Sequence, residues 1–253
     1  MPLLSVITIN LNNADGLDKT ISSLKEQSFP DLEYIVIDGA SSDHSADILV
    51  KHKQFINKVV CEKDSGIYNA MNKGIDLCSG EYILFLNSGD VLCSGILNKI
   101  RNELNESEIV YGDLVTIDQE GKKEQHRSFD KIGVDELLLS TIWHPCTFFK
   151  RSVFETCGKY DESFRLAGDY EFYVRSILKK GLSNRHIPYF ISEFSLDGLS
   201  NRKSNQDLMN SERELAWKKN FSDVMVRFFK RSLTLKRSRE YRIGKLITRF
   251  LPV

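Results

Sequence analysis

The first ninety residues alternate between short apolar runs and longer segments whose apolar positions repeat at helical spacing. The runs typical of buried strands cover residues 5–10, 33–38, 58–62 and 82–86. The helical patterns lie between them, at residues 15–27, 43–53 and 67–75. This alternation predicts an α/β fold with a mostly parallel central sheet flanked by helices.

The most informative stretch runs from residue 62 to residue 90. A polar loop leads into a helix that places Ile67, Met71 and Ile75 on one face, and an apolar strand follows it. The strand ends in Asn87-Ser88-Gly89-Asp90. Because open α/β sheets bind their ligands beyond the carboxyl ends of the strands, we expect a site at this point.

The pattern changes after Asp90. It predicts a strand at 109–117, a hairpin turn at 119–122, a helix at 134–139, an extended segment at 142–149 and a segment at 164–180 that leads into a helix. This half should add mixed strands and the second wall of a cleft. Residues beyond about 205 predict helices outside the core, so we divide the chain into a domain at 1–204 and a helical, basic extension at 205–253.

Length and composition narrow the class of protein. The 253 residues fit one large α/β domain with an appendage, and no run approaches the 18 apolar residues of a membrane span. The amino terminus lacks the basic segment of a signal peptide and predicts a first strand. The five cysteines are odd in number and lack CxxC spacing, which favours reduced thiols in a cytoplasmic protein.

The net charge of zero conceals a basic carboxyl terminus. Residues 225–253 hold nine basic side chains and one acidic one, a net charge of +8, so residues 1–224 carry −8. Ile243, Leu246, Ile247 and Phe250 line one face of a predicted amphipathic helix with basic residues between them. We expect this helix to meet an anionic membrane surface at the inner face of the plasma membrane. Packing against the domain or a second subunit is the alternative, and no nucleic-acid-binding motif is present.

The chemistry points to carboxylates, because GxGxxG, GxxxxGK[ST], GxSxG and HExxH motifs are all absent. Asn10 and Asp38 end the first two strands, where Asp38 can accept from a base or ribose or else from loop amides. Asp90 can hold a divalent ion against phosphates. Asp169 starts a helical pattern and is either a base or a helix cap. His144 precedes Pro145 and is either functional or a structural histidine.

Several motifs follow one another in a recognisable order. They occupy residues 5–10, 36–43, 62–90, 144–151, 161–175 and 194–200. Together they resemble the family 2 glycosyltransferases with the GT-A fold, in particular the bacterial branch that builds exopolysaccharide, colanic-acid-type capsule or O-antigen. The resemblance spans Leu3 to about Ser200.

The resemblance implies roles for individual residues. The nucleotide-sugar donor would be bound by Asn10, Asp38, Asp64, Asn72, Asn87 and Asp90, with Asp90 also the metal ligand. Asp169 would be the general base of an inverting transfer, because a carboxylate beside the acceptor hydroxyl can take its proton. His144 and Arg175 would lie on the acceptor and phosphate side.

Three departures from the family pattern affect these expectations. The usual DxD metal motif reads Asn87-Ser88-Gly89 here, so only the following Asp90 remains to bind Mg²⁺ or Mn²⁺. Gly39 replaces the second acid of the usual DDGSxD turn. Met71 stands where the family often has an arginine ahead of the helix asparagine.

The sequence therefore predicts an inverting hexosyl- or N-acetylhexosaminyltransferase that uses a nucleotide-diphosphate sugar. A lipid-linked glycan acceptor and a role in surface polysaccharide assembly would suit the basic helix. Two alternatives stay open: a catalytically silent subunit that binds sugar nucleotides at the membrane, and a sugar nucleotidyltransferase. The sequence leaves the donor sugar, the linkage and any homo-oligomer open.

Overall fold

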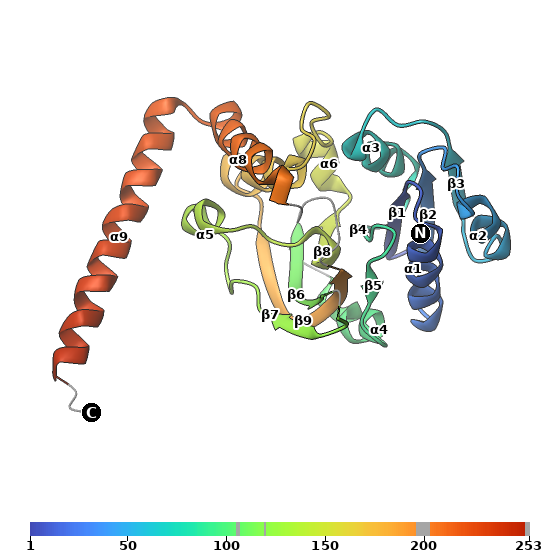
Figure 1. The fold of residues 1–253 in the computed structure, drawn as a ribbon, viewed down its shortest axis with the longest axis horizontal. Helices are drawn as coiled ribbons and strands as arrows, with labels where there is room; N and C mark the ends of the chain where they lie inside the picture. Colours follow the sequence, from blue (N-terminus) through green and yellow to red (C-terminus); the bar gives the residue numbers. More distant parts are fainter. Residues whose placement is uncertain (105–106, 119, 196–202, 251–253) are drawn as a thin grey trace.

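The computed structural model describes residues 1–104, 107–118, 120–195 and 203–250, with side chains described as far as residue 238. Within these ranges one nine-stranded sheet runs through the molecule in the order β3-β2-β1-β4-β8-β6-β9-β5, and β7 pairs with β6. Helices cover the sheet, and the last helix, α9, extends away from it (Figure 1). This arrangement confirms the predicted α/β class.

The first half of the chain forms the parallel part of the sheet. It consists of β1 (Leu4–Asn10), β2 (Leu32–Asp38), β3 (Lys58–Cys61) and β4 (Tyr82–Phe85). Strand β1 pairs in parallel with both β2 and β4, and its last residue, Asn10, lies opposite Asp38. The two polar side chains predicted at strand ends therefore meet at one edge of the sheet.

The second half adds mixed strands, as the sequence predicts. They are β5 (Val91–Leu92), β6 (Ile109–Ile117), β7 (Lys123–His126), β8 (Thr147–Lys150) and β9 (Asn184–Ser195). Strand β8 runs antiparallel between β4 and β6, so it joins the two halves. β6 and β7 pair antiparallel around the predicted hairpin turn.

Most of the helices lie where the apolar periodicity predicts them, whereas the short helices Ile96–Ile100 and Ser152–Cys157 are not among the predicted elements. The helices are α1 (Ala14–Glu26), α2 (Ser45–Lys51), α3 (Ile67–Leu77), α4 (Ile96–Ile100), α5 (Val134–Leu139), α6 (Ser152–Cys157), α7 (Gly168–Tyr173), α8 (Gln206–Asn220) and α9 (Asp223–Phe250). A π-helical stretch, η3 (Val174–Lys179), continues α7, and short 3₁₀ turns are η1 (Arg101–Glu103), η2 (His144–Cys146) and η5 (Lys203–Asn205).

Alternating side chains of the strands build a core on each face of the sheet. In β1, Val6 packs into the cluster that includes α1, whereas Ile7 packs into the cluster that includes α3 and α7. Helix α3 lies so close to the sheet that a Cβ on Gly74 would stand 2.4 Å from Ile7 Cγ2. Gly74 therefore permits the close approach that fixes α3 beside the ends of the parallel strands.

One element differs from its prediction. Residues 142–149 were expected to be extended throughout, but residues His144–Cys146 form the 3₁₀ turn η2 before β8 begins. Pro145 favours this turn because its ring fixes φ near the helical value. The turn carries His144, so the break in the strand decides where that side chain lies.

Helix α8 belongs physically to the main core. Ala216 and Trp217 are buried in the same cluster as α3 and α7, and Trp217 Nε1 donates to the Tyr170 hydroxyl at 2.7 Å. The division of the chain at residue 204 stays a prediction. The predicted amphipathic face at residues 243–251 lies outside the described side chains, although the α9 backbone is helical to Phe250.

Candidate active site

The ends of β1 and β2 form the first part of the site. Asn10 Nδ2 donates to Asp38 Oδ1 at 2.7 Å and to Ser45 Oγ at 2.8 Å. Asp38 also accepts from the Ser41 backbone N–H at 2.9 Å and from its hydroxyl. Asp38 thus accepts a hydrogen bond from a loop amide, which is one of the two roles that the sequence predicts for it. Asn10 Oδ1 is buried and has no hydrogen-bond partner in the part of the chain that the structure describes, which leaves an acceptor at this edge of the sheet.

Asp64 approaches the same edge from the loop before α3. Its carboxylate pairs with Lys73 of α3 at 2.8 Å, and Lys73 also pairs with Glu62 at 2.7 Å. A Cβ placed on Gly39 would lie 3.1 Å from Asp64 Oδ2. The structure therefore brings Asp64 beside the turn that follows β2. This contact explains why glycine replaces the usual second acid at position 39, since a carboxylate there would face that of Asp64.

A second group lies beyond β4. It consists of Asn87, Asp90 and His144. His144 Nε2 lies 3.0 Å from Asn87 Nδ2 and 3.8 Å from Asp90 Oδ2. Asp90 is only 5% exposed, and burial raises its pKa to about 8. Burial also lowers the pKa of His144, against the nearby charge of Asp169.

Two buried oxygens of this group, Asn87 Oδ1 and Asp90 Oδ2, have no hydrogen-bond partner among the described residues. Unpaired buried acceptors are costly, and a cation satisfies them. The described part of the chain nevertheless contains no cluster of three or more His, Cys, Asp or Glu side chains able to hold a metal. Asn87 and Asp90 together suit an ion that takes most of its ligands from water and substrate phosphates, as Mg²⁺ does.

Asp169 stands on the other side of His144. Its Oδ1 accepts from the Tyr68 hydroxyl at 3.3 Å and from the Tyr170 backbone N–H at 2.8 Å. Its Oδ2 lies 3.8 Å from His144 Nδ1 and accepts no hydrogen bond from the described residues. Asp169 is therefore not the cap of α7, whose N-cap residue is Ala167. One oxygen is held in place, and the other faces the site.

Tyr68 is a site residue that the sequence did not single out. It is a buried residue of α3, where an aromatic side chain normally indicates a core position. Burial, together with the charge of Asp169, keeps the pKa of Tyr68 well above its usual value, so its hydroxyl stays a donor. Gly168 makes the contact possible, because a Cβ there would lie 2.7 Å from the Tyr68 ring. The sequence holds no motif that would identify Tyr68 as a site residue, because Tyr68 and Gly168 lie far apart in the chain.

Two predicted site residues have their polar groups engaged elsewhere. Asn72 donates to the Tyr160 carbonyl and to Glu162, and it accepts from the Tyr160 N–H at 3.0 Å. Arg175 pairs with Glu171 at 2.9 Å and donates to the carbonyls of Cys157, at the end of α6, and of Lys159. These contacts join helices to the segment at residues 157–162. Both amide hydrogens of Asn72 are therefore engaged within the described residues, and the roles of Asn72 and Arg175 toward substrate stay predictions.

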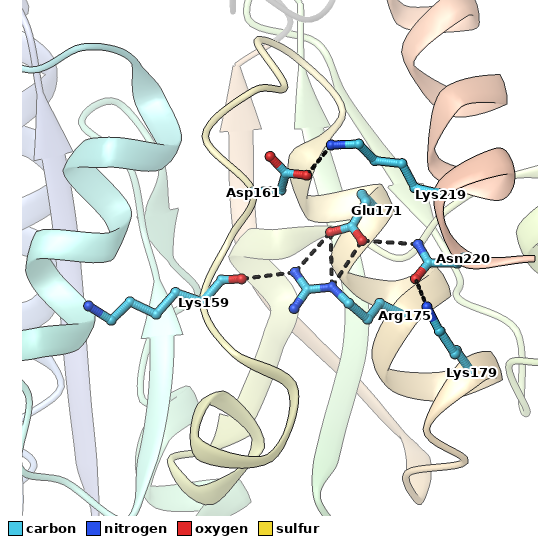
Figure 2. Close-up of a pocket in the computed structure, with 7 residues that line it drawn as sticks. All are labelled: Lys159, Asp161, Glu171, Arg175, Lys179, Lys219 and Asn220. Atoms are coloured by element: carbon cyan, nitrogen blue, oxygen red, sulfur yellow. Dashed lines mark hydrogen bonds and ion pairs between the residues drawn. The ribbon is translucent and has the colours of Figure 1, made fainter.

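A hollow of about 460 Å³ lies next to Arg175 (Figure 2). Its lining is Lys159, Asp161, Glu171, Arg175, Lys179, Lys219 and Asn220. The close-up shows most of these side chains joined to one another by hydrogen bonds and ion pairs, whereas Lys159 is joined to Arg175 through its backbone carbonyl. Except for Arg175 it contains none of the predicted site residues, so we place the candidate site at the sheet edge instead.

The fold is that of the GT-A glycosyltransferases. Solved structures that share it include S. aureus TarS 1-349 in complex with UDP-GlcNAc, with a TM-score of 0.62 and 19% identity over 77% of this chain and 58% of that one. Another is the mannosyltransferase PcManGT from Pyrobaculum calidifontis in complex with GDP-Man and Mn²⁺, with a TM-score of 0.57 and 18% identity over 76% of this chain and 56% of that one. The chain thus spans less than two thirds of these structures.

Sequence comparison identifies the family. Residues 5–158 match Glycosyl transferase family 2. The chain is also 29% identical over 209 residues to a PGL/p-HBAD biosynthesis glycosyltransferase of Mycobacterium bovis. The aligned region covers 79% of this chain and 80% of the relative. The chain belongs to glycosyl transferase family 2. This assignment confirms the resemblance to family 2 and argues against a sugar nucleotidyltransferase, whereas the exopolysaccharide, capsule or O-antigen branch stays a prediction. No helix in the described ranges has the length and apolar content needed to cross a bilayer.

Proposed function

We propose that this chain is an inverting glycosyltransferase that moves a hexosyl or N-acetylhexosaminyl group from a nucleotide-diphosphate sugar to a glycan acceptor. The observation that carries the proposal is the placement of Asp90 and Asp169 on opposite sides of His144, each 3.8 Å from one of its ring nitrogens. Inverting transfer needs an electrophilic stabiliser at the leaving group and a base at the acceptor. In this arrangement Asp90 can act at the leaving group and Asp169 at the acceptor.

The donor side is formed by the sheet edge. Asn10, Asp38 and Asp64 line the ends of β1 and β2, and Asn10 Oδ1 is a buried acceptor without a partner. Such acceptors suit the N–H groups of a base or the hydroxyls of a ribose. The UDP-GlcNAc and GDP-Man complexes of two proteins with this fold support a nucleotide sugar as the ligand class.

We assign the divalent cation, Mg²⁺ or Mn²⁺, to Asp90 Oδ2 and Asn87 Oδ1, the two buried oxygens without partners. When bound there, the ion would neutralise charge on the leaving diphosphate. The Mn²⁺ complex of PcManGT supports this choice of group.

The base is Asp169. Tyr68 and the Tyr170 amide hold Oδ1, so Oδ2 is the oxygen that accepts the proton of the acceptor hydroxyl. The acceptor oxygen forms its bond to the anomeric carbon while the bond from that carbon to the diphosphate oxygen breaks on the opposite face. The proton ends on Asp169, the electron pair leaves with the nucleoside diphosphate, and the anomeric configuration is inverted.

The acceptor is proposed to be lipid-linked, in surface polysaccharide assembly at the cytoplasmic face of the membrane. Support comes from α9, where Val224, Met225, Phe228 and Leu235 are exposed large apolar residues. At 100° per residue they fall within one face, and Arg227 and Arg231 border it. An exposed apolar face with basic flanks is typical of helices that lie on anionic bilayers.

Release of nucleoside diphosphate tests the function. The wild-type protein is incubated with UDP-N-acetylglucosamine, UDP-glucose, UDP-galactose or GDP-mannose, Mn²⁺ and simple glycoside acceptors. We expect transfer from at least one donor, and a loss of at least 100-fold in Asp169→Asn with an unchanged melting temperature. Full activity in that variant would refute the base assignment.

The silent-subunit alternative is favoured by one observation, the absence of a three-ligand metal cluster among the described residues. It predicts that a nucleotide sugar binds but is neither hydrolysed nor transferred by the wild-type protein. Binding is measured by the rise in melting temperature, because a ligand specific for the folded state stabilises it.

A further inference from the structure

The loop that leads into α7 is bound by a single carboxylate from another helix. The backbone N–H groups of Arg165, Leu166 and Ala167 each donate to Glu212 across 2.8 Å. Glu212 belongs to α8 and is only 6% exposed. Hydrogen bonds from N–H groups to an ionised acceptor are shorter and about twice as strong as neutral ones. Three of them on consecutive amides fix the conformation of this loop.

The loop matters because Asp169 follows it directly. Ala167 is the N-cap of α7 and its carbonyl accepts the first helical bond from Glu171 N–H at 2.9 Å, but its side chain cannot cap a helix. Glu212 accepts the hydrogen bonds of these three amides, and Asp169 Oδ2 accepts no hydrogen bond from the described residues.

The helix that carries Glu212 has further contacts with α7. Five residues after Glu212, Trp217 is buried and its Nε1 donates to the Tyr170 hydroxyl at 2.7 Å. That hydroxyl donates in turn to the Leu137 carbonyl, and the Arg213 guanidinium lies 4.8 Å above the Tyr170 ring. Tyr170 is the residue after Asp169, so α8 holds α7 on both sides of the proposed base.

We propose that Glu212 is a positioning residue for the transfer reaction: it fixes the entry to α7 so that Asp169 Oδ2 faces the acceptor. The proposal rests on the proposed role of Asp169 as base. It makes α8, which lies beyond the segment matched by the family, a necessary part of the catalytic unit. Misplacing a catalytic group by about 1 Å can cost on the order of 100-fold in rate.

The chain offers a matched control. Glu171 is also a buried glutamate that ties α7 to α8, through Asn220 at 3.0 Å, and it pairs with Arg175. It lines the hollow beside Arg175, whose lining does not include Asp90, His144 or Asp169 (Figure 2). Glu171→Gln should therefore lower thermal stability in the same way as Glu212→Gln while leaving the loop at 165–167 in place.

The kinetic test compares kcat and KM for the donor that the wild-type protein turns over fastest. In Glu212→Gln we expect kcat to fall 10- to 100-fold with the donor KM changed less than threefold, and in Glu171→Gln we expect kcat within twofold of wild type. Glu212→Asp keeps the charge on a shorter side chain and should lose about three- to tenfold. The inference is overturned if Glu212→Gln keeps full kcat or if Glu171→Gln loses as much.

A double variant separates positioning from general damage. If Glu212 acts through Asp169, adding Glu212→Gln to Asp169→Asn lowers the residual rate no further, because residues that act as a unit are not additive. Additive losses would overturn the inference. Full activity of Asp169→Asn alone would overturn both the base assignment and this inference. A dead Asp169→Asn with a normal Glu212→Gln would overturn the inference only.

Hydrogen exchange tests the contact without any substrate. The amides of Arg165, Leu166 and Ala167 should exchange at least tenfold faster in Glu212→Gln than in wild type or Glu171→Gln, at a temperature where all three are folded. Unchanged exchange would show that Glu212 does not hold the loop, whatever the kinetics. If Glu212→Gln does not fold, Glu212→Asp takes its place in both measurements, with the same outcomes deciding.

Discussion

The Tyr68 hydroxyl donates to Asp169 Oδ1 at 3.3 Å and so joins α3, from the parallel half of the sheet, to α7, from the mixed half. These residues are 101 positions apart in the chain. The contact closes one side of the candidate site and orients the carboxylate that we propose as base.

Tyr68→Phe should lower kcat about 2- to 10-fold, because it removes one hydrogen bond with a net value of about 0.5–1.5 kcal/mol. The donor KM should stay unchanged, since Tyr68 contacts the proposed base rather than the sheet edge. Tyr160→Phe is the control: its ring packs 5.5 Å from that of Tyr68, but its buried hydroxyl has no hydrogen-bond partner. Equal losses in the two variants would mean that the Tyr68 hydroxyl plays no particular part.

Gly39→Asp should weaken nucleotide binding although it restores the usual family pattern. The new carboxylate would start from a Cβ 3.1 Å from Asp64 Oδ2, and like charges about 4 Å apart repel by roughly 1–4 kcal/mol between water and a protein surface. We expect the Kd of the preferred nucleoside diphosphate, measured by calorimetry among UDP, GDP and TDP, to rise at least fivefold. Gly39→Asn has the same size without the charge and should bind more tightly than Gly39→Asp. Identical affinities would exclude repulsion by Asp64.

How far the sequence leads can be judged from these residues. Strand and helix periods place Asn10, Asp38 and Asp90 at carboxyl ends, because parallel register follows from the βα order. The meeting of Asp90, His144 and Asp169 does not follow, since it depends on β8 pairing between β4 and β6 and on the turn η2. Asn72 was assigned to the donor because a polar residue in a motif looks the same whether it faces a ligand or, as here, the Tyr160 backbone.

Asp90→Asn should abolish the effect of Mn²⁺ on nucleotide binding. In the wild type we expect Mn²⁺ to lower the Kd of the preferred nucleoside diphosphate at least tenfold, because the ion satisfies the unpaired Asp90 and Asn87 oxygens and the diphosphate together. The variant keeps the shape but loses the charge. Asp113→Asn alters another buried carboxylate, which pairs with His186 at 2.7 Å, and should keep the Mn²⁺ effect. A response to Mn²⁺ that persists in Asp90→Asn would place the ion elsewhere.

Glu33→Gln should make the protein less stable at neutral pH and less sensitive to acid. Burial opposes ionisation of Glu33, but hydrogen bonds from Lys58, Ser5 and Ser79 outweigh it and lower its pKa from 4.5 to about 2. A carboxyl group whose pKa is lowered by folding stabilises the folded protein at pH values above its pKa in the unfolded chain. This stability is lost as the pH falls from about 5 to 2. Leaving buried partners unsatisfied should cost about 1–3 kcal/mol at pH 7.

Urea unfolding of wild type and Glu33→Gln at pH values from 7 to 2.5 measures this difference, with the exposed Glu26→Gln as control. The free energies of unfolding of wild type and Glu33→Gln should converge toward low pH, whereas Glu26→Gln should follow the wild type throughout. A constant gap between wild type and Glu33→Gln would contradict the linkage.

The apolar face of α9 should determine binding to anionic vesicles. Truncation after Asp223 would also remove Val226 and Phe229, and Phe229 packs against Trp217 and Phe221 at 5.9 and 5.5 Å between ring centroids. Substitutions on the exposed face are therefore the sharper test. Phe228 and Leu235 are 67% and 58% exposed, so Phe228→Asp with Leu235→Asp should leave the melting temperature unchanged.

Flotation with phosphatidylglycerol-rich vesicles should recover most of the wild-type protein, and the double variant should lose at least three quarters of that recovery. Both lost apolar contacts and two new negative charges act in the same direction on an anionic surface. Leu215→Asp, which alters an exposed leucine of α8, should float like the wild type. Binding should also weaken with salt and with neutral phosphatidylcholine, because roughly 1 kcal/mol per basic residue is electrostatic. If the double variant floats as well as the wild type, α9 does not attach this glycosyltransferase to the membrane.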